Sequence, residues 1–110
     1  MRANDYQHLA MKYCPVYDER ETLMYGAMGL CGEAGEASEI VKKHLFQGHE
    51  LDRQHLIREM GDVAWYLACL CYCVGTDMET VFETNIQKLR ERYPDGYNDH
   101  DSINRKPGDV

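Results

Sequence analysis

The sequence predicts an all-α domain built from four helices. Apolar residues recur every three or four positions through most of the chain, which is the spacing that gathers them on one side of a helix. Segments with the alternating pattern of a β-strand are almost absent. Glycine and proline residues divide the periodic regions into four stretches. At 110 residues, the chain has the size of one ordinary domain.

The ends of the four stretches carry recognisable signals. Asp18 with Glu21, and Thr76 with Glu79, have the spacing of a capping box at a helix N-terminus. Residues that stop helices follow the stretches, namely Pro15, Gly48, Gly75 and Pro94. We therefore expect helices over residues 4–13, 18–46, 52–74 and 76–93.

The third stretch is apolar on more than one side, so its helix is expected to be central. A lone domain of this size leaves much of its surface exposed, and helices that are apolar on several sides favour an oligomer. We expect a single helical domain over 1–97 and an irregular tail over 98–110, which is polar and rich in turn-forming residues. A flap over the functional site is the alternative interpretation of this tail.

The formal net charge of −7 argues against non-specific binding to nucleic acid, which needs a basic surface. An acidic protein binds a polyphosphate only when cations intervene, either basic side chains or metal ions. No apolar run is long enough to span a bilayer, so we expect no membrane association.

Five cysteines are present, and the N-terminal residues lack the apolar region of a signal peptide. The odd number of cysteines and the missing signal predict reduced thiols in the cytoplasm. Cys69, Cys71 and Cys73 are spaced by two, which points their side chains in different directions on a helix. We interpret them as small buried apolar residues rather than metal ligands.

Two pairs of carboxylates stand out. Glu33 and Glu36 are three residues apart, as are Glu59 and Asp62, so each pair lies on one face of its helix. If the second and third helices are antiparallel, the two pairs meet, and four like charges then require counter-charges. All-carboxylate sites suit hard cations, so Mg²⁺ is predicted, with Mn²⁺ possible.

The same carboxylates have two alternative interpretations. Di-iron bundles use Glu-x-x-His on two helices, and the chain contains no such motif. The remaining alternative is that the four carboxylates are solvated surface charges, and the pattern alone leaves this open.

Five further side chains fit the binding of phosphate. One follows Glu36 by two helical turns, one follows Asp62 by four residues, and three form a polar stripe on the fourth helix. They are Lys43, Tyr66, Asn85, Lys88 and Arg92. The alternative is that Lys88 and Arg92 pair with Glu91 or with the helix C-terminus.

Glycines inside the second stretch each weaken a helix by about 1 kcal/mol relative to alanine. Close approach of a neighbouring helix, or room for a metal or substrate, would offset that cost at Gly26, Gly29, Gly32 and Gly35. Trp65, the only tryptophan, is interpreted as a core residue, with stacking on a base as the alternative. The five histidines show no paired spacing, and we assign them no chemistry.

Three blocks of the sequence resemble the MazG-like all-α nucleotide pyrophosphohydrolases. In order, they are GLCGEAGEASEIVKKHL, LIREMGDVAWYLA and NIQKLRERYPDGY. The family pattern of Glu-x-x-Glu, a spacer and Glu-x-x-Asp is present, with 22 residues between Glu36 and Glu59. The resemblance covers roughly residues 20–97.

This resemblance implies a four-helix-type bundle that assembles as a homodimer or homotetramer. It implies magnesium-dependent cleavage between the α- and β-phosphates of a nucleoside triphosphate, which removes unwanted nucleotides. By match to the motif, the metal ligands would be Glu33, Glu36, Glu59 and Asp62, with Lys43, Tyr66, Asn85, Lys88 and Arg92 near the substrate. Glu36 is our candidate for the group that accepts the proton of water.

Two competing functions remain. The related phosphoribosyl-ATP pyrophosphohydrolases share the helical fold and differ in substrate. A non-catalytic helical module that binds a nucleotide or a partner protein is the other, although such a module has no need for four intact carboxylates.

Overall fold

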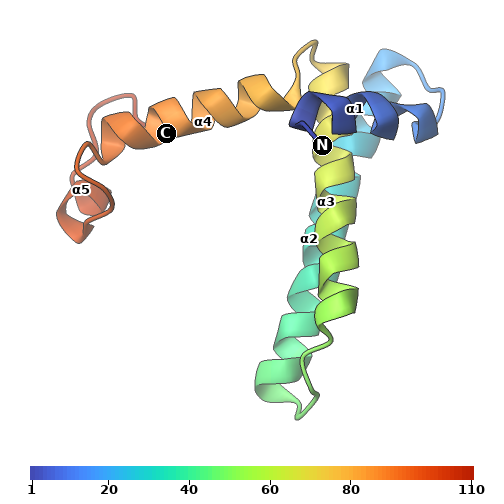
Figure 1. The fold of residues 1–110 in the computed structure, drawn as a ribbon, viewed down its shortest axis with the longest axis horizontal. Coiled ribbons are helices and arrows are strands. Elements are labelled where there is room, and N and C mark those ends of the chain that lie inside the picture. Colours follow the sequence, from blue (N-terminus) through green and yellow to red (C-terminus); the bar gives the residue numbers. More distant parts are fainter. The chain divides into compact units, whose positions relative to one another are not determined.

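The computed structural model of the protein describes residues 1–110, and its regular structure is entirely helical (Figure 1). The elements are α1 (Ala3–Ala10), the 3₁₀ turn η1 (Met11–Tyr13), α2 (Glu19–Phe46), α3 (Arg53–Cys73), α4 (Met78–Arg92) and α5 (Asp99–Ile103). The predicted all-α class is confirmed. None of these helices combines the length and the apolar character needed to cross a membrane. The chain divides into two compact units, residues 1–78 and 79–110, which are described separately.

In the first unit, α2 and α3 run antiparallel and pack against each other along their length (Figure 1). Asp18 caps α2 by accepting a hydrogen bond from the Glu21 amide at 2.8 Å, which confirms the predicted start. The loop after α2 turns at Gly48, whose φ of +74° suits glycine. Asp52 then caps α3 through the His55 amide at 3.0 Å. These local signals define the α2–α3 hairpin.

Side-chain hydrogen bonds join α1 to the rest of this unit. Gln7 donates through Nε2 to the Thr76 carbonyl at 3.2 Å and accepts from the Met78 amide at 2.8 Å. Trp65 on α3 donates through Nε1 to the Ala10 carbonyl at 3.1 Å. Trp65 is half-buried, in keeping with a packing role. The first helix is therefore held at the end of the hairpin that carries the α3–α4 turn.

Thr76 does not start the fourth helix, contrary to the capping-box prediction. Its amide donates to the Cys71 carbonyl at 2.9 Å and its carbonyl accepts from Gln7, so it belongs to the turn that closes α3. The fourth helix begins two residues later, at Met78. Tertiary hydrogen bonds to α1 have overridden the local signal.

The core of the first unit is small and lies where α1, η1, α2 and α3 meet. Its buried apolar side chains are Ala10, Ala68, Cys69, Cys71 and Met78. Cys69 is fully buried and its Sγ lies 3.9 Å from that of Cys14, without a disulfide. Burial, together with neighbouring Cys14, raises the pKa of the Cys69 thiol to about 12. Cys69 and Cys71 thus lie in the core, as predicted, whereas Cys73 is only half-buried.

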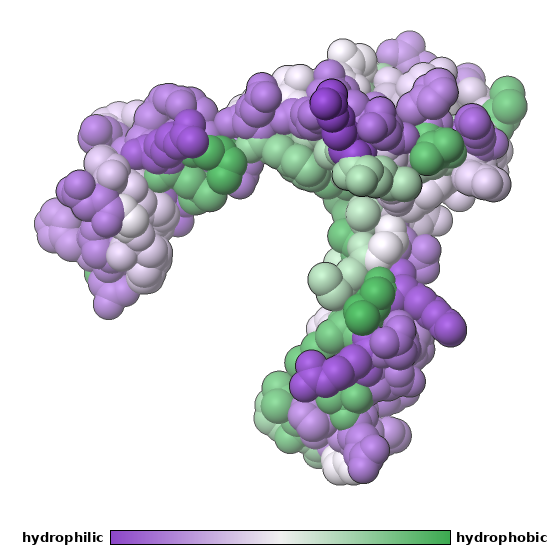
Figure 2. Space-filling view, in the orientation of Figure 1, coloured by the Kyte–Doolittle hydropathy of each residue, from purple (hydrophilic) through white to green (hydrophobic).

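The expectation that α3 is buried on several sides is only partly correct. Ile57 and Met60, in its first half, are 57% and 59% exposed, and Leu23 on α2 is 44% exposed. A hairpin of two helices covers only the facing sides of each, so apolar atoms remain visible along it (Figure 2).

In the second unit, residues that follow α4 fold back on its C-terminal end. Arg92 in the last turn of α4 forms a two-pronged ion pair with Asp109. The segment 98–110 was expected to be an irregular tail, but it contains the short helix α5, capped by the Asn98 side chain, which accepts from the Asp101 amide at 2.7 Å. The rest of the segment lacks regular structure.

Candidate metal centre

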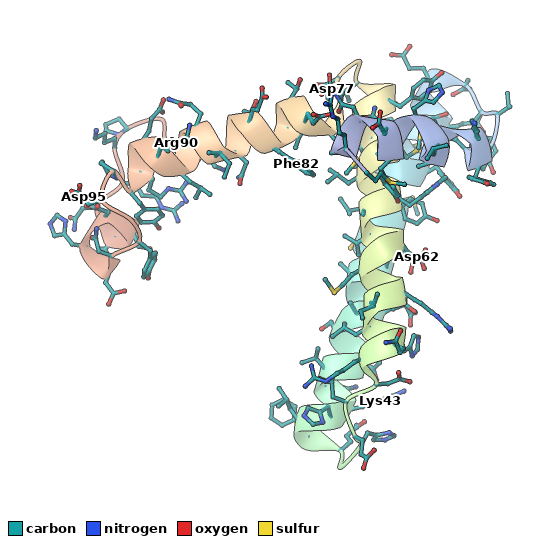
Figure 3. All side chains as sticks on the ribbon, viewed as in Figure 1. Lys43, Asp62, Asp77, Phe82, Arg90 and Asp95 are labelled. Carbon is teal, nitrogen blue, oxygen red and sulfur yellow. The ribbon has the colours of Figure 1, made fainter.

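Three of the four predicted carboxylates converge between the two long helices. Glu33 projects from α2, while Glu59 and Asp62 project from α3 one turn apart. One oxygen from each carboxylate lies within 4.8 Å of the others. Glu33 and Glu59 are half-buried, whereas Asp62 is exposed. Figure 3 labels Asp62 on α3. The antiparallel hairpin brings together side chains that are up to 29 residues apart in the sequence.

Glu36 lies outside this three-carboxylate cluster. It follows Glu33 by one turn of α2 and is exposed to solvent. Its charge nevertheless contributes to the electrostatic field at Glu33. The structure therefore places Glu36 at the edge of the cluster, where it can face solvent and a ligand.

The electrostatics at Glu33 are dominated by burial and by like charges. Burial raises the pKa of Glu33, and a hydrogen bond with Glu59 and the charges of Asp62, Glu59 and Glu36 raise it further. A divalent cation bound among these carboxylates would compensate their negative charge. Three converging carboxylates with hard oxygen ligands fit Mg²⁺ or Mn²⁺.

Two residues beside the cluster were not predicted from the sequence. His55, one turn before Glu59 on α3, approaches the Glu59 Oε1 through its Nε2 at 2.9 Å. Tyr6 of α1 lies close enough to Asp62 that burial, and next the Asp62 charge, raise the pKa of its phenol. The i, i+4 spacing of His55 and Glu59 was a usable signal. Tyr6 had none, because its position depends on how α1 docks.

Tyr66 is part of an aromatic group rather than an isolated side chain. Its ring lies 5.4 Å from that of Tyr25 and 5.0 Å from that of Trp65, measured between centroids. A hydrogen bond with Tyr66, followed by burial, raises the pKa of Tyr25 to about 12. The Tyr66 ring also rests on Gly29, where a β-carbon would overlap it. These contacts hold Tyr66 one turn beyond Asp62.

The glycines of α2 separate into two classes. A β-carbon on Gly26 would lie 2.9 Å from Leu70 Cδ2, and one on Gly29 would overlap Tyr66, so close helix approach explains both. Gly32 and Gly35, which flank Glu33, have no atom within 4 Å of the position of a β-carbon. The backbone beside the carboxylates is therefore open.

The other predicted phosphate-binding residues are distributed over both units. Lys43 is exposed in the last turn of α2, two turns beyond Glu36 (Figure 3). Asn85 and Lys88 are exposed on α4. Arg92 is mostly covered, since Asp109 occupies its guanidinium group. Glu91 accepts a hydrogen bond from Gln87, while Arg92 binds Asp109. The alternative pairing of Arg92 with Glu91 is therefore not formed.

The fold and the cluster together define the class of protein: an all-helical protein with carboxylates that converge between two facing helices. Residues 21–97 match the family described as the MazG nucleotide pyrophosphohydrolase domain, and the chain belongs to that family. It is also similar to the Gene 37 protein of Mycobacterium phage L5, with 40% identity over 79 residues, which cover 68% of this chain and 69% of the phage protein. No solved structure matches the chain significantly. The matched range contains all four carboxylates and every predicted substrate-binding residue.

Proposed function

We propose that the protein is a magnesium-dependent nucleoside triphosphate pyrophosphohydrolase that cleaves the α–β phosphate bond of NTP or dNTP. The observation that carries this proposal is the convergence of Glu33, Glu59 and Asp62 within 4.8 Å. Membership of the MazG family supports hydrolysis of a nucleotide at a coarse level. The role we favour is removal of excess or non-standard nucleotides.

The reaction consumes one water molecule and gives a nucleoside monophosphate, pyrophosphate and a proton. The water oxygen bonds to the α-phosphorus, and the bond from that phosphorus to the bridging oxygen breaks. A bound divalent cation would neutralise phosphate oxygens and lower the pKa of water. Glu33, Glu59 and Asp62 would hold it, and Glu36, one turn beyond Glu33, would complete the set.

The other residues supply positioning and charge. Glu36, exposed at the edge of the cluster, is our candidate acceptor for the proton of the attacking water. His55 would fix the orientation of the Glu59 carboxylate through the 2.9 Å contact. Lys88 and Arg92 would stabilise charge on the departing pyrophosphate, with contacts from Lys43, Tyr66 and Asn85 to the substrate.

The test is product identification by ³¹P NMR with a panel of NTPs, dNTPs and phosphoribosyl-ATP in the presence of Mg²⁺. We expect a monophosphate and pyrophosphate from one or more nucleoside triphosphates. Cleavage of phosphoribosyl-ATP alone would assign the protein to the related phosphoribosyl-ATP pyrophosphohydrolases of histidine biosynthesis. Binding of nucleotides without any cleavage would identify a non-catalytic module and overturn the proposal.

A further inference from the structure

The ion pair between Arg92 and Asp109 has the geometry of anion recognition. Arg92 Nε donates to Asp109 Oδ2 at 2.8 Å and Nη2 donates to Oδ1 at 2.6 Å. Both side chains are largely covered, with 10% and 15% of their surfaces exposed. A guanidinium group binds carboxylate and phosphate oxygens through the same two-pronged arrangement. The covered pair therefore differs from the mobile ion pairs of an ordinary surface.

Other cations surround the same carboxylate. The end of α4 and the residues after α5 enclose a cavity of about 530 Å³, which basic and acidic side chains line. The basic ones are Lys88, Arg92, Arg105 and Lys106, and the acidic ones are Glu91, Asp95, Asp101 and Asp109. The bond to Arg92, and next the charges of Arg92, Arg105 and Lys88, hold the pKa of Asp109 below its ordinary value. Three basic residues thus act on Asp109, and without its charge the four basic side chains of the cavity would face three carboxylates.

We propose that this cavity is a binding site for a phosphate group and that the chain's own Asp109 carboxylate fills it until a phosphate-bearing ligand displaces it. A pyrophosphate group carries more negative charge than one carboxylate and would satisfy Arg92, Lys88 and Arg105 together. The inference rests on the proposed function for the identity of the ligand, since Lys88 and Arg92 are the predicted phosphate contacts.

The consequence is that Asp109 weakens phosphate binding. A ligand must separate the Arg92–Asp109 pair before it can use the guanidinium group, and the energy of that separation is lost from the binding energy. Removing the negative charge of Asp109 should therefore increase affinity. If Asp109 only fastened the end of the chain to α4, its removal would leave affinity unchanged or lower it.

The experiment is isothermal titration of the 110-residue chain with inorganic pyrophosphate in EDTA, so that the carboxylate cluster holds no metal. Asp109→Asn should raise the affinity roughly tenfold. Asp95→Asn is the matched control, because Asp95 lines the same cavity and has no hydrogen bond to Arg92. Its charge change should alter the affinity only about twofold. Equal affinities for the two variants would overturn the proposal.

A double variant guards against an indirect effect on folding. Once Arg92→Ala has removed the guanidinium group, adding Asp109→Asn should produce far less than the tenfold gain. A full gain without Arg92 would also overturn the proposal. Neither titration requires catalysis, so a protein that hydrolyses nucleotides but shows no Asp109 effect would retain the proposed function and lose this inference.

Discussion

Glu33 combines partial burial with three neighbouring negative charges, and its behaviour decides how the site responds to pH and metal. Its pKa is raised by burial first and by Glu59, Asp62 and Glu36 afterwards. A carboxyl whose pKa is higher in the folded state binds more protons there than in the unfolded chain. The free energy of unfolding contributed by Glu33 therefore falls as the pH rises through that pKa.

Glu33→Gln should raise the melting temperature of the metal-free protein at neutral pH, because it removes the unfavourable charge. The gain should shrink as the pH falls toward the ordinary glutamate pKa and vanish below it, where Glu33 is protonated in both states. Added Mg²⁺ should stabilise the wild type and have less effect on the variant. Melting curves at pH 5 and pH 7.5, with EDTA or Mg²⁺, measure this, and a variant that is less stable in EDTA at neutral pH would oppose it.

Gly29 shows how one missing side chain positions the aromatic group. Gly29→Ala should destabilise the protein by about 1–3 kcal/mol, because the new methyl group overlaps the Tyr66 ring. Gly35→Ala is the control in the same helix, and should be neutral or stabilise by up to about 1 kcal/mol, because its site is open. Urea unfolding distinguishes them, and equal effects would show that Tyr66 does not rest on Gly29.

Much of the site could be predicted at this scale. The i, i+3 spacing predicted that Glu59 and Asp62 share a face, and antiparallel packing of the two long helices predicted that Glu33 would lie near them. The exposed position of Glu36 depends on the register between α2 and α3, and the docking of Tyr6 depends on α1. Neither is encoded in local periodicity.

The elements of the first unit are held by a few directed bonds as well as by apolar contact. Gln7 is the main example, because one side chain satisfies a donor and an acceptor in the turn between α3 and α4. The sequence predicted most helix ends, through caps such as Asp18 and stops such as Gly48. It failed at Thr76, where the bonds to Cys71 and Gln7 compete with the local capping signal.

Gln7→Ala should lower the free energy of unfolding by about 1–3 kcal/mol, because it leaves the Met78 amide and the Thr76 carbonyl without their partner. Gln47→Ala, at the exposed C-cap of α2, is the matched control and should cost less than about 0.5 kcal/mol. Urea unfolding of both variants measures the difference. If the two substitutions cost the same, Gln7 does not hold α1 in place.

At the scale of the whole molecule, large apolar side chains remain uncovered on three of the helices. Large apolar side chains on α2, α3 and α4 are more than 40% exposed, among them Met28, Leu45, Ile57, Met60, Phe82 and Ile86. The apolar periodicity of the sequence predicted faces of this kind but not what covers them, since periodicity gives a face and no partner.

We propose that a second copy of the chain covers the exposed apolar side chains of α2 and α3, among them Met28, Leu45, Ile57 and Met60. This would give the homodimer or homotetramer implied by the resemblance. Ile57→Glu should then shift the protein to the monomer in light scattering coupled to gel filtration, because a charge would be buried at the interface. Arg58→Glu, at the adjacent exposed position, is the control for added negative charge. A wild type that is monomeric at micromolar concentration would contradict the assembly.

The most direct measurement of the proposed chemistry is the Mg²⁺ dependence of pyrophosphate release from the preferred nucleotide, for wild type, Glu33→Gln and Glu39→Gln. Glu39 lies on the same helix, pairs with Lys42 and is outside the three-carboxylate cluster, so its variant is the matched control. We predict that release requires Mg²⁺, falls by roughly 100-fold or more in Glu33→Gln and is unchanged in Glu39→Gln. Release that persists in EDTA, or that Glu33→Gln leaves intact, would show that the carboxylate cluster is not the catalytic metal centre.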